Sequence, residues 1–430
     1  MGDLKNRVLL QRDFTRPNQI GSSTSDQYGH GTHIAGIVAG SGNGSRDANT
    51  AAFTGMAPGA YLLDLQVLGA DGSGTTSSVI RAIEWSIANR ERYRIRIINL
   101  SLGRPVNEFT LNDPLILAVE RAVRAGIVVV ASAGNLGVVD GQQVVGGIVS
   151  PGYAPDALTV GATNTQNTVY RSDDTVATWS SRGPVGNPED PSGWLLKPDV
   201  VAPGTNIIST ADTNSVLWQQ NPTRRVEGVA GGKYLRLSGT SMSTAVVSGA
   251  AALVLQANPR LTPAQVKVAL QLTAQPLNGV GLIEQGAGEI NVPVAVSLVK
   301  AKDPLALSMQ STIGGETVRA GGIVFGTTLI WGNTLIWGNT LIWGNTLIWG
   351  NTLIWGNTLI WGNTLIWGNT AGQISGSTLI WGNTLIWGNA QVTDLSGNTL
   401  IWGNTLIWGN RGCEPPPVGA EDAPPCGAGA

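Results

Sequence analysis

The sequence contains little cysteine, little histidine and few charged residues. Its 430 residues include only Cys413 and Cys426, so residues 1–412 have neither a disulfide framework nor a cysteine-ligated metal site. Charged residues make up 13% of the chain, about half the usual share, and the net charge is -2. No long run of Lys or Arg is present, so neither nucleic acid nor an anionic membrane surface is an expected partner.

The chain also lacks the apolar stretch of a signal peptide near Met1. Both cysteines lie in a Pro-rich segment, residues 411–430, whose low complexity predicts a disordered tail. In an oxidising compartment Cys413 and Cys426 would close a small loop, and two free thiols are an equally good interpretation. The sequence leaves both interpretations open.

Apolar, strand-like runs alternate with helical patterns over residues 1–303. The expected strands cover residues 60–68, 95–100 and 126–131, and the expected helices cover 77–90 and 115–125. Short strand–helix–strand steps predict an α/β fold, a doubly wound parallel sheet with helices on both faces. Near-continuous Val and Ile runs favour strands that are buried on both sides, and the run at 60–68 is interpreted as one of them.

A different kind of sequence follows a predicted linker at residues 304–322. Between Thr328 and Asn410 the hexapeptide Thr-Leu-Ile-Trp-Gly-Asn occurs eleven times, and the region extends over 323–410. A period of six excludes an amphipathic helix, and Gly-Asn in every copy excludes a membrane helix. The β-prone tetrad and the turn pair predict stacked short strands, a solenoid-like β-repeat that self-associates or binds a surface. A partly disordered or aggregating tract and a Trp ladder that binds carbohydrate or peptide are the alternatives.

Ser241 is the candidate nucleophile. It lies in Gly-Thr-Ser-Met-Ser, residues 239–243, directly before the helical stretch 245–256. A serine at a helix N-terminus lies at the positive end of the helix dipole, and its backbone N–H is free to donate to an oxyanion. Taken alone, Gly-Thr-Ser is more often an N-cap than a nucleophile.

Two further residues have chemistry that complements such a serine. His30, one of only two histidines, lies in Gly-His-Gly-Thr-His at the start of the expected helix 34–39, and a neutral imidazole is the base that a serine needs. Asn135 ends a buried strand, where its amide would donate to an oxyanion. Taken alone, His30 would be a histidine at a helix start without a chemical role, and Asn135 would be an asparagine in a turn. His30 and His33 do not match the zinc-protease helix, because no Glu lies between them.

In this order, the three segments resemble the subtilisin-like serine proteases, peptidase family S8. The resemblance covers about residues 1–300 and includes the segments 67–74, 83–89, 99–103, 180–184 and 197–204. It implies that His30 is the general base, that Ser241 is the nucleophile and that Asn135 assists the oxyanion hole. It also implies two substrate-binding edges and a wall of the pocket for the P1 side chain, formed by Gly72, Ser73, Gly74, Ser101, Leu102, Gly103, Ala131, Ser132, Ala133 and Gly134.

The third triad member of that family has no counterpart in the sequence. The family's Asp lies in an Asp-Ser-Gly or Asp-Thr-Gly turn before the His, and no such turn precedes His30. Asp3 and Leu4 resemble the pair that follows the turn, so the resemblance implies that the Asp, a signal peptide and an inhibitory propeptide lie upstream of this sequence. Asp13 and Asp26 are weaker stand-ins, because neither lies in such a turn.

The resemblance implies a serine endopeptidase that is secreted or located at the cell surface and acts on proteins or peptides. Its chemistry requires no cofactor, and no metal belongs to its catalytic site. Calcium is expected as a structural ion, with oxygen ligands offered by Asn43, Asp47 and Asn49, although a solvated polar loop is the simpler interpretation of this segment. A catalytically impaired binding module, and an adhesion protein whose main function lies in the repeats, are the alternatives. The P1 preference depends on three-dimensional packing and is not readable from the sequence.

Overall fold

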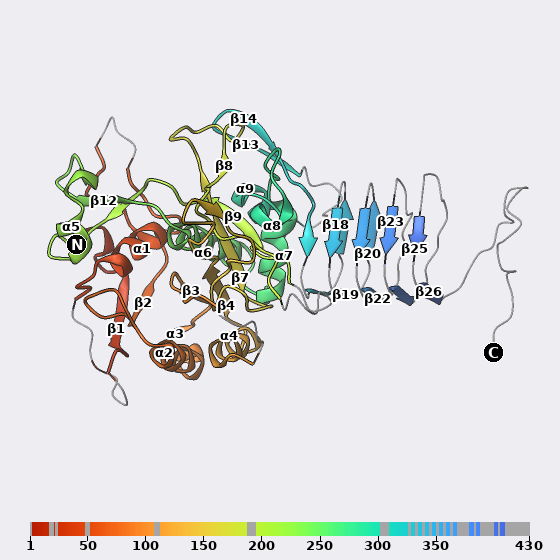
Figure 1. The fold of residues 1–430 in the computed structure, drawn as a ribbon, viewed down its shortest axis with the longest axis horizontal. Coiled ribbons are helices and arrows are strands. Elements are labelled where there is room, and N and C mark those ends of the chain that lie inside the picture. The colour runs from red at the N-terminus through yellow and green to blue at the C-terminus, as the bar shows by residue number, and fades with distance from the viewer. Residues whose placement is uncertain are drawn as a thin grey trace, which may run out of the picture. The chain divides into compact units, whose positions relative to one another are not determined.

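The computed structural model forms two compact units, Met1–Thr328 and Leu329–Ala430, which are described separately (Figure 1). Several sequence predictions lie outside the described residues, namely those for Asn49, Cys413, Cys426 and the tail at 411–430. The structure describes residues 2–16, 21, 25–47, 52–106, 112–186, 195–301 and 309–325, and the backbone of the strands within 328–408.

A five-stranded sheet forms the centre of the first unit. Its parallel strands are β3 (Ile97–Leu100), β4 (Val128–Ser132), β7 (Leu158–Asn164) and β9 (Val200–Pro203), and β8 (Thr175–Val176) pairs antiparallel with β7. The strands predicted at 95–100 and 126–131 are therefore confirmed. The remaining strands of this unit are β1 (Val8–Asp13), β2 (Leu62–Gln66), β5 (Val138–Val139), β6 (Gln142–Gln143), β10 (Ile207–Thr210), β11 (Arg225–Glu227), β12 (Lys233–Leu237), β13 (Gln310–Ile313), β14 (Glu316–Arg319) and β15 (Val324–Phe325).

Helices cover both faces of this sheet, as the sequence pattern predicts. Val128 and Val130 contribute to one hydrophobic cluster with α1 and α6, while Val129 and Ala131 contribute to a second one with α2 and α4. Successive strand residues point to opposite faces, so β4 is buried on both sides. The helices are α1 (His30–Ala39), α2 (Thr76–Ala88), α3 (Arg90–Tyr93), α4 (Pro114–Arg124), α5 (Val216–Gln220), α6 (Thr240–Ala257), α7 (Pro263–Thr273), α8 (Leu282–Gln285) and α9 (Val292–Lys300).

Helix α6 runs through the core of the first unit. It contacts α1, α7 and α9 as well as β3, β4, β7 and β9. Its 18 residues are long and apolar enough to cross a membrane by length and composition, but 72% of them are buried inside the fold. A helix that is apolar on every side is what a core position requires.

The predicted strand at 60–68 forms, but its burial differs from the prediction. Every residue of β2 is half-buried, and β2 pairs in parallel only with β1, in a separate two-stranded sheet. In β3, Ile97 and Ile98 are also half-buried. Each of these two strands has one edge without a paired strand among the described residues, so the Leu side chains of β2 and the Ile side chains of β3 are only partly covered.

The region between α9 and the repeats contains a hairpin. Strands β13 and β14 pair antiparallel, and Glu316 accepts hydrogen bonds from the backbone N–H groups of Arg171, at 2.6 Å, and Ser172, at 3.0 Å. Most of the described part of the predicted linker is therefore held against the first unit. The boundaries 1–303, 304–322 and 323–410 stay predictions.

The backbone of the repeats forms short strands. Strands three copies apart pair in parallel, for example Thr334 with Thr352 and Thr340 with Thr358, so identical positions of the hexapeptide face each other. The packing of their side chains, and with it the solenoid, stays a prediction. These strands are β16 (Thr328–Trp331), β17 (Thr334–Trp337), β18 (Thr340–Trp343), β19 (Thr346–Trp349), β20 (Thr352–Trp355), β21 (Thr358–Trp361), β22 (Thr364–Trp367), β23 (Thr378–Trp381), β24 (Thr384–Trp387), β25 (Leu400–Trp402) and β26 (Thr405–Trp408).

A buried charge network connects the sheet to α7. Asp199 precedes β9 and is fully buried, and its carboxylate lies 2.7 Å from Lys197 Nζ and 3.0 Å from Lys267 Nζ. The backbone N–H of Thr159 also donates to Asp199, at 2.7 Å. Burial lowers the pKa of Lys197 to about 8, although Asp199 opposes this shift. The carboxylate therefore compensates two buried ammonium groups.

We predict that Asp199→Asn destabilises the first unit by about 3–5 kcal/mol, because it leaves two buried cations without their counter-charge. Urea unfolding followed by circular dichroism measures the change. Asp140→Asn is the matched control, since Asp140 is exposed in the turn between β5 and β6 and should tolerate the change. Equal stability of the two variants would contradict the role assigned to Asp199.

Candidate active site

Ser241 is placed at the surface by the otherwise buried first part of α6. From Gly239 to Ala251 every residue except Ser241 is buried, and Ser241 is half-buried. It lies in the first turn of α6, where the backbone N–H groups have no partner inside the helix. Ser241 Oγ donates to the carbonyl of Ser101 at 3.3 Å, and Ser101 Oγ donates to the carbonyl of Ser241 at 2.8 Å. The hydroxyl therefore lies against the segment that follows β3.

Thr240 fixes the orientation of the Asn135 amide. Asn135 Oδ1 accepts hydrogen bonds from the Thr240 backbone N–H and from Thr240 Oγ1, both at 3.0 Å. Gly134 N–H in turn donates to Thr240 Oγ1 at 3.2 Å. Because the amide oxygen is engaged, the Asn135 amide NH2 is left to donate elsewhere. Asn135 is exposed and beside the start of α6, so this donor and the Ser241 backbone N–H lie at the same surface.

His30 is the first residue of α1, and the helix start is held by Asp26. The Asp26 carboxylate accepts hydrogen bonds from the backbone N–H groups of Gly29, at 2.8 Å, and Thr32, at 2.6 Å. Burial lowers the pKa of His30, and the charge of Asp26 partly offsets this shift. The imidazole is therefore neutral at pH 7, as a general base requires. His30 and Ser241 are not hydrogen-bonded to each other in the described part of the chain.

Neither stand-in carboxylate is oriented as a partner for the imidazole. Both Asp26 oxygens are engaged by the backbone at the start of α1. Asp13, at the end of β1, accepts hydrogen bonds from the backbone and hydroxyl of Thr15, at 2.8 and 2.6 Å. Asp64 in β2 was not predicted to lie near this site; its pKa is raised by burial and, to a smaller extent, by the charge of Asp26. A carboxylate within the apolar strand was the feature of the sequence that could have drawn attention to Asp64.

The first predicted substrate-binding edge lies next to the His30 segment. Gly72 has φ = 77°, a conformation that glycine adopts most readily, and a Cβ there would lie 2.6 Å from Cζ of Tyr28. Ser73 and Gly74 are exposed, so their backbone is accessible. No role for Tyr28 was predicted, because its contact with Gly72 joins segments that are distant in the sequence.

The second predicted edge and the pocket wall lie together at the ends of β3 and β4. Ser132 Oγ donates to the carbonyl of Leu102 at 3.2 Å, and Ser101 contacts Ser241 as described above. Gly103 is exposed, while the wall residues are buried. The structure thus brings Ser241, Asn135, the second edge and the wall together. The two parallel strands deliver these segments because their carboxyl ends meet at one edge of the sheet. The wall residues are Ala131, Ser132, Ala133 and Gly134.

His33 is a buried structural residue. It is 1% exposed, and its Nε2 donates to the carbonyl of Leu235 at 2.9 Å, which fixes the tautomer. The carbonyl of His33 accepts a hydrogen bond from Ser209 Oγ at 2.7 Å. Burial lowers the pKa of His33 to about 4. The side chain therefore anchors α1 to β12 and has no position at the surface.

The loop predicted to bind calcium surrounds Asp3. Gly44 N–H donates to Asp3 Oδ1 at 2.8 Å, and Ser41 Oγ donates to the same oxygen at 3.4 Å. Among the described residues, no group of three His, Cys, Asp or Glu side chains is placed to hold a metal ion. Calcium sites also use backbone oxygens, so a structural calcium ion stays a prediction.

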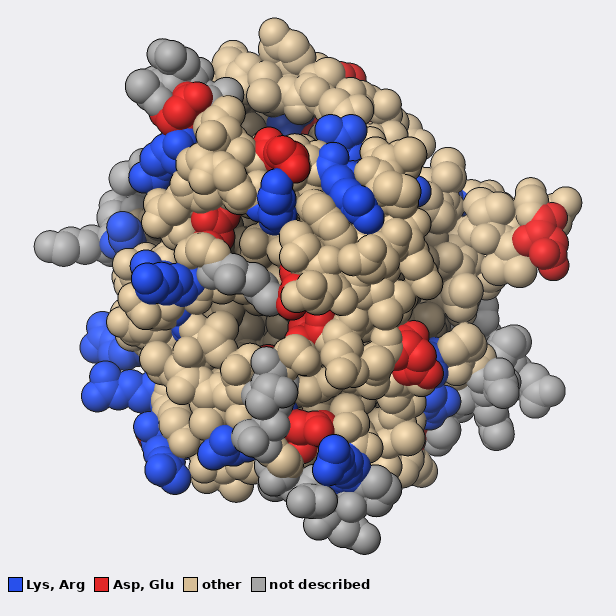
Figure 2. Space-filling view, turned by 90° about the vertical axis from the view of Figure 1, so that its left-hand side faces the viewer, with Lys and Arg blue, Asp and Glu red and all other residues tan. Residues whose placement is uncertain are grey.

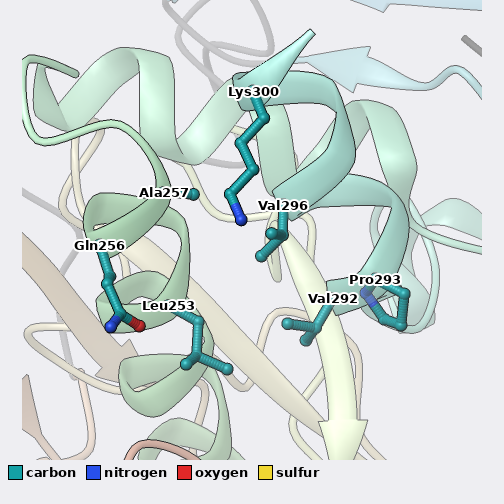
Figure 3. Close-up of a pocket in the computed structure, with 7 residues that line it drawn as sticks. All are labelled: Leu253, Gln256, Ala257, Val292, Pro293, Val296 and Lys300. Carbon is teal, nitrogen blue, oxygen red and sulfur yellow. The ribbon is translucent and has the colours of Figure 1, made fainter. Parts of the chain in front are cut away.

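An open apolar groove lies between α6 and α9, away from these residues. Its volume is about 700 Å³, and Figure 3 shows the side chains that line it. Lys300 is its one charged lining residue, and no nucleophile or base lies in it. The groove therefore contributes nothing to the chemistry at Ser241. The lining residues are Leu253, Gln256, Ala257, Val292, Pro293, Val296 and Lys300.

The molecular face in Figure 2 carries acidic and basic residues interspersed, and most of its described surface is uncharged. This matches a chain in which charged residues are 13% of the total. On this face, uncharged surface separates the charged side chains of the described residues.

A serine at the start of a core helix, a nearby amide donor and a histidine at another helix start define an α/β protein with a serine-centred site. Residues 11–290 match the model of the subtilase family. This match covers most of the first unit, and the chain belongs to the subtilase family.

Curated relatives are similar over the same region. Serine protease AprX of Bacillus subtilis (strain 168) is 39% identical over 299 residues, which are 68% of this chain and 63% of the relative. Subtilisin E of the same strain is 36% identical over 281 residues, 65% of this chain and 58% of the relative. Subtilisin Savinase of Lederbergia lenta is 35% identical, covering 64% of this chain and 79% of the relative. The chain thus spans about three fifths of the length of the first two.

Solved structures share the fold of the first unit. Sphericase matches with 29% identity and a TM-score of 0.53, covering 67% of this chain and 86% of that chain. The S41 psychrophilic protease matches with 27% identity and the same TM-score, again covering 67% and 86%. The subtilisin-like α/β fold predicted from the sequence is confirmed for this unit.

We predict that His33→Gln weakens the pH dependence of stability between about pH 4 and 6.5. The folded-state pKa of His33 is about 4, below its ordinary value of 6.5, so the unfolded chain binds more protons in this window. Its contribution to stability therefore falls as pH decreases, by about 1.4 kcal/mol per pH unit. Gln keeps an N–H donor for Leu235 but does not titrate. Urea unfolding at pH 7 and 4.5 measures the slope, and an unchanged slope would refute this assignment.

Proposed function

We propose that the protein is a serine endopeptidase that hydrolyses peptide bonds through an acyl-enzyme intermediate. The observation that carries the proposal is the placement of Ser241. It is the one accessible residue in the buried start of α6, and its backbone N–H lies at the same surface as the amide donor of Asn135. Membership of the subtilase family, and the similarity to named proteases, support this reaction class.

In the proposed reaction, His30 takes the proton of Ser241 Oγ as the oxygen attacks the scissile carbonyl. The Ser241 N–H and the Asn135 amide donate to the oxyanion, a contribution that grows with the negative charge. His30 then gives the proton to the leaving amine, and the acyl-enzyme remains. Water, deprotonated by His30, attacks the ester, and His30 returns this proton to Ser241 Oγ as the acid is released. The lowered pKa of His30 fits this role, because a cationic imidazole cannot accept the first proton.

The catalytic Asp is proposed to come from a strand upstream of this sequence. The split between the sheet of β1 and β2 and the five-stranded sheet supports this assignment. Val67, just after β2, and Leu100, at the end of β3, pack in the same hydrophobic cluster under α2. A parallel strand between β2 and β3 would pair with both open edges and cover their half-buried Leu and Ile side chains. Its carboxyl end would lie at the edge where Ser101 and Ser241 meet.

The substrates are proposed to be proteins or peptides bound in an extended conformation between two backbone edges. The exposed backbone of Ser73 and Gly74 and the exposed Gly103 are available for strand-like hydrogen bonds. An N-terminal propeptide, secretion or display at the cell surface, and a structural calcium ion are proposed from the family resemblance. No cofactor enters the proposed chemistry.

The repeats are proposed to form a β-solenoid with three copies in each turn. The parallel pairing of Thr334 with Thr352 and of Thr346 with Thr364 supports this, because each pair joins strands three copies apart. Identical strands stacked in register satisfy their backbone hydrogen bonds along the stack. Self-association or binding to a surface is the role proposed for this region. The similarity to named proteases does not favour the alternatives, a catalytically impaired binding module or an adhesion protein acting through the repeats.

We predict that the full-length protein hydrolyses casein and that Ser241→Ala abolishes this activity, by about six orders of magnitude in kcat, the loss measured for the serine of a subtilisin. An active-site serine reagent such as a fluorophosphonate should label the unmodified protein once and leave Ser241→Ala unlabelled. Ser243→Ala, in the same helix but with a buried hydroxyl, is the matched control and should retain labelling. Hydrolysis that survives Ser241→Ala would exclude Ser241 as the nucleophile.

We predict that residues 1–430 alone turn over about 10⁴-fold more slowly than the protein extended by its upstream residues, a loss similar to that measured for the Asp of a subtilisin. The physical reason is that the Asp orients the imidazole and stabilises the imidazolium. Hydrogen exchange gives an independent measure, because the upstream strand should protect backbone amides of β2 and β3. Equal activity and equal protection in both proteins would contradict the upstream strand.

A further inference from the structure

One side chain fills the space between the second substrate-binding edge and the wall of the predicted P1 pocket. Val149 lies in the segment between β6 and β7 and is 6% exposed. Its backbone N–H donates to the carbonyl of Ala133 at 2.9 Å. The next residue, Ser150, exchanges two backbone hydrogen bonds with Arg104, at 2.9 and 3.0 Å. Val149 is therefore fixed between the segment that follows β3 and the segment that follows β4.

The two methyl groups of Val149 reach both sides of this space. A Cβ built on Gly134 would lie 2.6 Å from Val149 Cγ1 and 3.1 Å from Val149 Cγ2. A Cβ built on Gly103 would overlap Val149 Cγ2 and lie 3.1 Å from Val149 Cβ. Both glycines thus face the isopropyl group directly, and Gly134 has φ = 106°, a backbone conformation that further favours glycine. The space that two glycines leave between the edge and the wall is occupied by valine.

We infer that Val149 forms the floor of the P1 pocket and restricts the enzyme to small P1 side chains, such as alanine. This inference rests on the proposed function, in which the substrate lies along Ser101–Gly103 with its scissile carbonyl at Ser241. A P1 side chain that enters between Gly103 and Gly134 meets the Val149 methyl groups before it reaches the depth that an aromatic ring needs. Discrimination then comes from steric exclusion, because the floor is held by backbone hydrogen bonds on both sides.

Two peptide substrates that differ only in P1, alanine or phenylalanine, test this assignment in the full-length protein. We expect kcat/KM to favour alanine by at least about tenfold in the unmodified protein. Val149→Gly should raise kcat/KM for the phenylalanine peptide on the order of tenfold to hundredfold and reverse the preference. Val149→Ala should give an intermediate ratio.

A core variant separates this effect from a loss of stability. Val119→Ala removes a buried side chain of α4 in the same hydrophobic cluster as Ala131 and Ala133, and it should leave the P1 ratio unchanged. If Val149→Gly does not fold, Val149→Ala and Val149→Leu supply the test, because leucine should reduce even the alanine peptide's kcat/KM. A phenylalanine preference in the unmodified protein, or a ratio that Val149 substitutions leave unchanged, would overturn the inference.

Binding of product-like peptides distinguishes this inference from the proposed function. Acetylated tetrapeptides ending in alanine or phenylalanine are titrated by calorimetry into the Ser241→Ala variant, which cannot turn over. Tighter binding of the alanine peptide to Ser241→Ala supports the assignment of Val149 as the pocket floor. The double variant with Ser241→Ala and Val149→Gly should bind the phenylalanine peptide more tightly instead. Both results are informative even if no peptide is hydrolysed. Absence of hydrolysis together with this pattern would count against the endopeptidase and for the pocket.

Discussion

The burial of the first part of α6, up to Ala251, is the constraint on which the site depends. This helix contacts three other helices and four strands of the central sheet, and these contacts fix its axis and its start. Its first turn emerges at the carboxyl ends of β3 and β4, and Ser241 is the residue that reaches the surface there. Thr240 connects the same turn to Asn135 and Gly134. The geometry of the donors is thus a consequence of core packing.

The position of His30 depends on a different part of the molecule. Asp26 holds the start of α1, while the buried His33 fastens the same helix to β12. These contacts place the imidazole without orienting its ring, because no described residue is hydrogen-bonded to it. The sheet of β1 and β2 is separate from the five-stranded sheet, and the strand proposed to lie between them would also supply the carboxylate that orients the ring.

Much of the fold and of the candidate site could be predicted from the sequence, because local residue patterns determine the elements and the motifs. The periodicity of residues 95–131 indicates two strands and a helix, and all three form at those positions. Ser241, His30 and Asn135 are recognisable because each lies in a short segment at the end of a strand or the start of a helix. The half-buried state of β2 was not predictable, because burial depends on a neighbouring strand and not on the composition of β2 itself.

The sequence by itself determined the family, the order of the elements and the residue types available for the chemistry. It did so because strand and helix periodicity and the turn motifs around Ser241 and His30 are local properties of the chain. Only the tertiary structure decided that both Asp26 oxygens are engaged by backbone N–H groups, that Thr240 orients Asn135, and that Val149 lies between Gly103 and Gly134. Each of these is a contact between residues distant in sequence or a choice among possible partners, and packing makes that choice.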